Sequence, residues 1–167
     1  MRRGGAALAL AFASLTTTFA AGCATGTVDT AAPGDPGAVG AVLDDFHRAA
    51  ADGDFERYFG HFAADAVFLG TDAGERWTVE EFEAYARPYF GPGRGWTYRP
   101  RDRSVSFTPD GATAFFDELL DNDDLGVARG SGVLVREDGH WKVAQYNLSI
   151  PIPNERAADV VRLIRPR

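Results

Sequence analysis

The feature that most constrains this fold is a run of strand-like segments in the second half of the chain. From residue 96 to residue 150, stretches rich in β-branched and aromatic residues alternate with turn signals. The clearest turns, Pro-Asp-Gly at 109–111 and Asp-Gly at 138–139, are typical of antiparallel hairpins. We therefore expect consecutive antiparallel strands, at 96–100, 104–108, 112–120, 127–137 and 140–150.

Three helix patterns precede this run. Asp35 and Pro36 suit the N-cap and first position of a helix, and apolar residues then recur at helical spacing up to Gly53. A short helix is expected after Asp54, and a capping box at Thr78 begins a third. One short buried strand, 66–69, lies between them. This order predicts an α+β domain, in which three N-terminal helices cover one face of a curved antiparallel sheet and enclose a conical cavity.

Length and charge narrow the possible partners. A chain of 167 residues allows one domain of ordinary size. The formal net charge is −7, and an acidic surface repels phosphates, so we expect no nucleic-acid partner. The three histidines, His47, His61 and His140, are far apart and lack the spacing of a metal site. We therefore expect neither a metal nor a cofactor.

The first residues have the layout of a secretory signal. Arg2 and Arg3 form a basic region, and residues 6–20 are mainly apolar but too short for a convincing membrane-spanning helix. We interpret residues 1–22 as a signal peptide. The Ala-Gly before Cys23 resembles the end of a bacterial lipoprotein signal, which implies that Cys23 is acylated and anchors the protein in a membrane. The alternative is ordinary cleavage nearby, with Cys23 incidental.

Residues 23–37 are rich in Ala, Gly, Thr, Pro and Asp, a composition typical of a flexible tether. We expect an exported protein: a lipoprotein of the cell membrane or of its periplasmic side, or otherwise a secreted protein.

Several short motifs, taken together and in order, resemble a known family. They are Phe68-Leu69-Gly70-Thr71-Asp72, Glu75-Arg76-Trp77, Phe116-Asp117-Glu118, and the segments 129–134, 138–143 and 147–153. With the order of elements, the chain from 39 to 154 resembles the SnoaL-like branch of the nuclear-transport-factor-2-like (NTF2-like) superfamily. The resemblance implies that residues 38–155 form an NTF2-like domain and that 156–167 are a C-terminal tail or short helix.

What the resemblance implies for function is broad. The superfamily includes steroid isomerases, polyketide cyclases, dehydratases and subunit-assembly modules, and the fold alone does not choose among them. Many similar domains carry His-x-His in the final strand, where this chain has Gln145 and Asn147. An amide cannot shuttle protons as imidazole does, so this departure weakens an acid–base mechanism built on that strand.

Gln145 and Asn147 are nonetheless candidates for the wall of a ligand pocket. If no bulge follows the 138–139 turn, Gly132 faces Gln145 and Gly130 faces Asn147, and both amides share one face of the sheet. The glycines would then leave space for a ligand or an aromatic side chain. Alternatively, the glycines only permit curvature, and a single β-bulge would turn both amides to the other face.

Glu118 is the candidate carboxylate of the cavity. Asp117 and Glu118 are adjacent on a strand and face opposite sides, so one can point inward and act as an acid or a base. The alternative is a structural pairing with an arginine such as Arg129. Trp77 and Arg129, which belong to the motifs above, complete the pocket candidates.

The histidines do not add a catalytic set. We expect His47 on the surface of the first helix, His61 near a helix end and His140 beside a turn, and no catalytic residue is assigned.

Three functional hypotheses remain open at this point. The first is a domain that binds a small, largely apolar molecule in the cavity. The second is a cofactor-independent isomerase, cyclase or dehydratase that uses a cavity carboxylate. The third is an assembly module that forms a homodimer through the outer face of its sheet, which would then be apolar.

Overall fold

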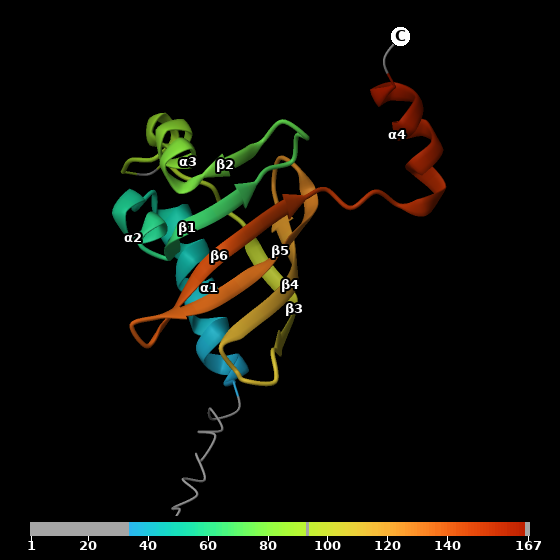
Figure 1. The fold of residues 1–167 in the computed structure, drawn as a ribbon. Coiled ribbons are helices and arrows are strands. Elements are labelled where there is room, and N and C mark those ends of the chain that lie inside the picture. Colours follow the sequence, from blue (N-terminus) through green and yellow to red (C-terminus); the bar gives the residue numbers. More distant parts are fainter. Residues whose placement is uncertain (1–33, 93, 166–167) are drawn as a thin grey trace, which may run out of the picture.

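The domain is built around a curved six-stranded sheet (Figure 1). The structure is a computed structural model and describes residues 34–92 and 94–165. The strand order is β2-β1-β6-β5-β4-β3. The strands are β1 (Phe62–Leu69), β2 (Arg76–Thr78), β3 (Arg99–Phe107), β4 (Thr113–Asn122), β5 (Gly126–Glu137) and β6 (His140–Ser149). The predicted antiparallel pairing of consecutive strands is confirmed for β3–β4, β4–β5 and β5–β6, and all neighbouring pairs are antiparallel except β1 and β6, which run parallel.

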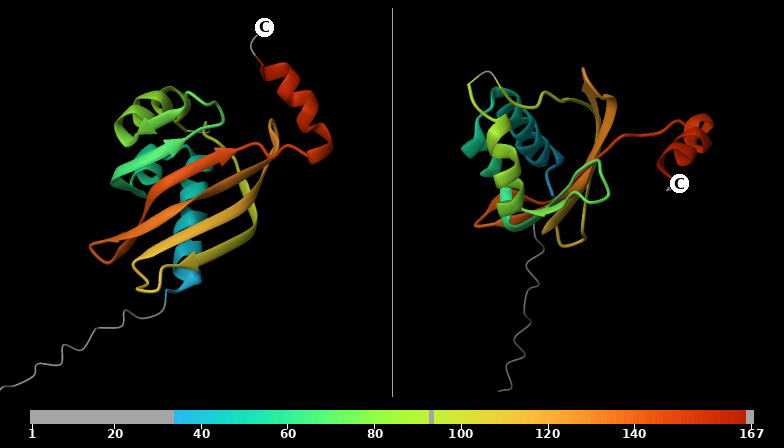
Figure 2. Two further views of the ribbon diagram at one scale, coloured as in Figure 1. Left: turned by 45° about the vertical axis from the view of Figure 1, so that its right-hand side comes forward. Right: turned by 90° about the horizontal axis from the view of Figure 1, so that it is seen from above.

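Helices lie together on one side of this sheet, as predicted (Figure 2). They are α1 (Pro36–Asp52), α2 (Phe55–Phe59), α3 (Val79–Ala86) and the 3-10 turn η1 (Arg87–Tyr89). α1 contacts β3 and β6, and α3 contacts β1 and β2. The buried core lies between these helices and the concave face of the sheet.

The helix boundaries follow from local chemistry. The Asp35 side chain accepts a hydrogen bond from the Gly37 backbone at 2.8 Å and caps α1. Gly53 ends α1 with a φ of 69°, a conformation that costs glycine little. Thr78 and Glu81 form the predicted capping box of α3.

Two irregularities in the strands shape the sheet. The predicted strands 96–100 and 104–108 form one strand, β3, whose register shifts between Arg101 and Ser104, where Asp102 has a φ of 52°. A second shift lies in the β5–β6 hairpin, where Val133 pairs with Gln145 but Leu134 pairs with Val143. Ala144 is therefore a one-residue bulge, and bulges of this kind increase the local twist of a sheet.

The C-terminal segment leaves the domain. After β6 the chain forms the 3-10 turn η2 (Asn154–Arg156) and helix α4 (Ala157–Ile164), which projects away from the sheet in both figures. Within the described residues, no helix combines the length and apolar character needed to cross a membrane. The predicted signal peptide, Cys23 and most of the predicted tether lie outside the described residues.

Candidate functional site

A cavity of about 180 Å³ lies between the helices and the concave face of the sheet. Residues from α1, α2, α3, β1, β2 and β6 line it, together with the β1–β2 and β4–β5 turns and the segment before β3. The lining residues are Phe46, His47, Ala50, Tyr58, Phe68, Gly70, Thr71, Glu75, Trp77, Phe82, Tyr85, Trp96, Tyr98, Leu125, Tyr146 and Leu148. Most of this wall is aromatic, which is typical of sites for small organic molecules.

Sheet register places several of these rings side by side. Trp77 of β2 pairs with Phe68 of β1, which pairs in turn with Tyr146 of β6, so three neighbouring strands each contribute one ring to the concave face. Phe82 of α3 stacks on Phe68 with ring centroids 3.9 Å apart, and Tyr85 stacks on Trp77 at 4.7 Å. The sheet and α3 therefore both contribute stacked aromatic rings to the cavity wall.

The base of the cavity contains a buried polar pair, His47 and Glu118. His47 Nε2 lies 2.6 Å from Glu118 Oε1, and both side chains are almost fully buried. The other carboxylate oxygen, Oε2, accepts a hydrogen bond from Arg103 Nε at 2.6 Å. Arg103 Nη1 also donates to the Gly40 carbonyl at 2.9 Å and to Asp44 at 2.7 Å. The guanidinium thus offsets the charge of a carboxylate that has no contact with solvent.

Strand alternation explains why Glu118 points inward. Ala114, Phe116, Glu118 and Leu120 of β4 are all buried, whereas Asp117 is exposed on the opposite face. The expectation that one of the two adjacent acids faces the core is confirmed. Its cationic partner is Arg103 and not Arg129, which is exposed.

His47 was expected on the helix surface, and this expectation is wrong. It is 5 % exposed and lines the cavity. The signal was present in the sequence, because His47 follows Leu43 by four residues and precedes Ala50 by three, and both belong to the buried stripe of α1. Hydrogen bonding of Nε2 with Glu118 leaves Nδ1 as the free ring nitrogen of His47.

Phenol groups supply further polar atoms along the cavity wall. Burial raises the pKa of Tyr58 and of Tyr146 well above the ordinary value, and nearby Glu118 adds to the effect at Tyr146. Burial also raises the pKa of Tyr98, with the charge of Asp124 as a smaller cause. All three phenols therefore remain protonated near neutral pH and can donate a hydrogen bond.

The bulge at Ala144 changes which residues of β6 face the cavity. Gly132 pairs with Tyr146 and Gly130 with Leu148, so the predicted pairing of these glycines with Gln145 and Asn147 is wrong. Tyr146 and Leu148 line the cavity, and Gln145 and Asn147 therefore lie on the outer face, where Gln145 is exposed. The space above Gly130 holds the Tyr146 hydroxyl, which a Cβ at position 130 would overlap.

The five pocket candidates are thus divided between two faces of the sheet. Trp77 lines the cavity, and Glu118 lies directly behind His47. Arg129, Gln145 and Asn147 are not among the lining residues.

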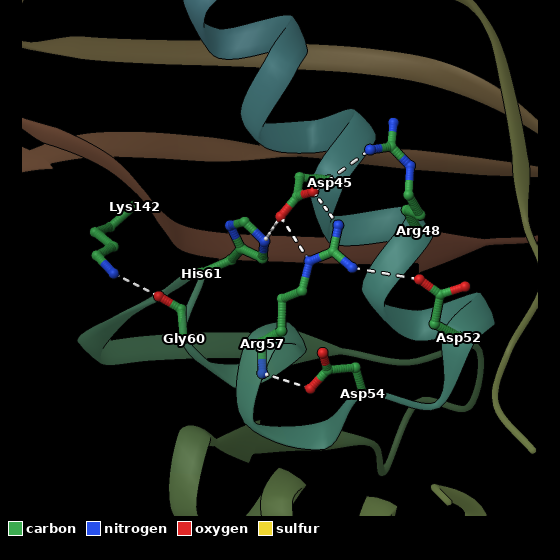
Figure 3. Close-up of polar contacts among 8 residues, drawn as sticks. All are labelled: Asp45, Arg48, Asp52, Asp54, Arg57, Gly60, His61 and Lys142. Atoms are coloured by element: carbon green, nitrogen blue, oxygen red, sulfur yellow. Dashed lines mark hydrogen bonds and ion pairs between the residues drawn. The ribbon is translucent and has the colours of Figure 1, made fainter. Parts of the chain in front are cut away.

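A second polar cluster lies outside the cavity and joins α1 to α2 (Figure 3). Asp45 accepts from Arg57 Nε at 3.0 Å and also pairs with Arg57 Nη2, while His61 Nε2 lies 3.1 Å from the same carboxylate. The Arg57 hydrogen bond lowers the pKa of Asp45 to about 2. Burial lowers the pKa of His61, and Asp45 partly opposes this.

Potential metal ligands do not gather anywhere in the described part of the chain: no group of three or more His, Cys, Asp or Glu residues could hold an ion.

The chain is similar in fold to several solved structures. An NTF2-like protein of unknown function from Pseudomonas putida KT2440 has a TM-score of 0.58 and 17 % identity, covering 70 % of this chain and 87 % of the other. A cystatin-like-fold protein from Nostoc punctiforme PCC 73102 has a TM-score of 0.58 and 15 % identity, covering 72 % and 96 %. An NTF2-like protein from Cytophaga hutchinsonii ATCC 33406 has a TM-score of 0.54 and 18 % identity, covering 68 % and 95 %.

Sequence comparison gives the family. No curated protein sequence matches the chain. The family model described as SnoaL-like domain matches residues 39–153, which include every strand of the sheet and all of the cavity wall. The NTF2-like neighbours share the fold of this domain. This chain therefore belongs to the SnoaL-like domain family.

Proposed function

We propose that the domain binds a small, largely apolar molecule in its aromatic cavity. The observation that carries this proposal is the cavity wall, in which nine of sixteen lining residues are Phe, Tyr or Trp. Apolar walls with a few convergent polar groups are the usual form of a ligand site. A cavity of roughly 150 Å³ accepts a benzene molecule, so the volume of about 180 Å³ suits a compound with one ring.

The polar groups at the base would fix the orientation of such a molecule. Tyr58 and Tyr146 offer hydroxyl donors, and His47 offers Nδ1. A ligand with one oxygen or nitrogen atom on an otherwise apolar ring matches this arrangement, because buried polar groups need hydrogen-bond partners.

The test is a binding screen read by tryptophan fluorescence, since Trp77 and Trp96 both line the cavity. We expect one-ring compounds that carry a single polar group to change the emission of the full chain. Leu148→Phe should weaken binding because it fills the cavity, whereas Val127→Phe, an enlargement at an exposed position outside the lining, should not. Equal binding by the two variants would contradict the proposal.

Proton transfer is a second candidate function, and the His47–Glu118 pair specifically favours it. In the neutral imidazole ring, a hydrogen bond donated by Nε2 to Glu118 places the lone pair on Nδ1, where it can take a proton from a substrate. Because Arg103 offsets the charge of Glu118, the base in this reaction is His47 and not the carboxylate. Deuterium uptake from D2O into an enolisable one-ring ketone tests it, and His47→Gln should abolish the uptake.

An assembly role receives less support from the outer face of the sheet. Phe115 and Val127 are exposed there, but Asp117, Arg129 and Gln145 lie on the same face. This surface is mixed, and the apolar face expected of an obligate dimer is not observed.

We also propose that the protein acts outside the cytoplasm, held by a lipid on Cys23. The support is the basic and apolar leader and the position of the only cysteine directly after Ala-Gly. A flexible tether would then separate the domain from the membrane surface.

A further inference from the structure

The volume of the cavity limits the size of the ligand, and the charged residues around the cavity limit the charge that the ligand can carry. Among the described residues that line the cavity, Glu75 is the one carboxylate, and none is Arg or Lys. Arg103, the nearest cation behind the base, is already paired with Glu118 and Asp44. Arg76 follows Glu75 in the chain, but it neighbours the inward-facing Trp77 and therefore lies on the outer face of β2.

Glu75 is held in place at the cavity by its own turn. Its backbone carbonyl accepts from Gly70, and its Oε2 accepts from the Asp72 backbone at 3.1 Å. These contacts fix a half-buried carboxylate and leave Oε1 available to a ligand. The chain thus places a negative charge in a mainly aromatic wall without a cation in that wall to balance it.

Acidic groups on different sides of the cavity raise the pKa of two tyrosines in its wall. Burial is the main cause that raises the pKa of Tyr85, and Glu75 adds to it. Asp124, in the β4–β5 turn, acts in the same sense on Tyr98. Tyr85 is 43 % exposed and Leu125 is 41 % exposed, so this end of the wall is the open end of the cavity. The opening is therefore bordered by acidic groups on the β1–β2 side and on the β4–β5 side.

We infer that the ligand of this cavity is an organic cation, with its apolar part among the aromatic rings and its ammonium group at the open end beside Glu75. This inference rests on the proposed binding function and names the class of molecule bound. A carboxylate attracts the ammonium directly, and the electron-rich faces of Trp and Tyr attract cations when the charge lies within about 6 Å of the ring centre. Anionic ligands are disfavoured by the same groups.

The test uses two probes that differ in charge but hardly in shape: phenyltrimethylammonium and tert-butylbenzene. Binding of each to the full chain is measured by tryptophan fluorescence. We expect the cation to bind roughly 3- to 30-fold more tightly, from one partly exposed ion pair and one cation–π contact. The preference should shrink as salt is added, because salt screens exposed charges.

Glu75→Gln should remove most of the preference, since the amide keeps an oxygen for the Asp72 hydrogen bond but loses the charge. Glu80→Gln is the matched control, because it makes the same change of net charge at an exposed position outside the cavity lining.

If tert-butylbenzene binds as tightly as the cation, the inference is wrong and the binding function stands. If neither probe binds, both are wrong. If Glu75→Gln and Glu80→Gln behave alike, Glu75 is not the recognising group.

Discussion

His47 Nε2 and Glu118 Oε1 lie 2.6 Å apart, although 71 positions separate the two residues in the sequence. This contact joins α1 to β4 through the interior of the domain. Arg103 of β3 completes the network from the other side of the carboxylate, so one helix and two strands meet at a single buried acid. The same network forms the floor behind the cavity.

Removing this acid should destabilise the fold strongly. Glu118→Leu leaves the mostly buried Arg103 without its main counter-charge, and breaking a buried pair from one side costs about 3–5 kcal/mol. Urea denaturation would measure the loss. Asp117→Leu is the matched control, because the neighbouring acid is exposed on the opposite face and should change stability by no more than about 0.5 kcal/mol. Equal losses in the two variants would show that the buried network does not stabilise the fold.

Substitutions at Gly130 and Tyr146 should have coupled effects on the free energy of unfolding. A Cβ at position 130 overlaps the Tyr146 hydroxyl, so Gly130→Ala should cost roughly 1–3 kcal/mol through overpacking. Tyr146→Phe removes the oxygen and should recover part of this cost in the double variant. A double-mutant cycle on free energies of unfolding measures the coupling, and strictly additive effects would contradict the predicted contact.

The order and type of the elements could be predicted from sequence because their signals are local. Asp35, Gly53 and the Thr78 capping box act within a few residues of themselves, and the 138–139 turn fixes the first pairs of its hairpin. The bulge at Ala144 could not be predicted in this way. Nothing in the local pattern marks it, yet it decides that Tyr146, and not Gln145, faces the cavity.

The site was harder to predict because its partners come from different elements. Alternation on β4 predicts that one acid points inward, but it does not identify Arg103, which lies within the register shift of β3. His47 carried a usable signal, since it falls on the apolar stripe of α1, but a histidine in such a stripe suggests burial without naming its partner.

The proposed lipid anchor depends on one side chain. Cys23→Ser should abolish incorporation of labelled fatty acid and move the protein from the membrane to the soluble fraction or leave an unprocessed precursor. Thr25→Ser serves as the control, because it changes a neighbouring residue without removing the thiol. Labelling that persists in the Cys23→Ser variant would refute the anchor.

The cluster around Asp45 should make stability depend on pH in two separate ranges (Figure 3). His61 gives the upper range. Burial lowers its pKa below 6.5, so the unfolded chain binds a proton first as the pH falls, and stability decreases from about 6.5 towards the lowered folded value. His61→Gln should remove this step from a plot of melting temperature against pH. His140→Gln, at an exposed histidine, should keep it.

Asp45 gives the lower range. Its folded pKa of about 2 lies below the ordinary value of 3.8, mainly because Arg57 donates a hydrogen bond to the carboxylate. The stabilisation from this pair is therefore fully present above pH 3.8 and is lost as the pH falls towards 2, where the folded protein also takes up the proton. Asp45→Asn should be less stable than the wild type near neutral pH, and it should lose less stability between pH 4 and 2 in the same melting series. Asp65→Asn, at an exposed acid of β1, is the control and should follow the wild-type curve. If the melting temperature of Asp45→Asn equals that of the wild type at every pH, the Arg57 contact does not contribute to folding.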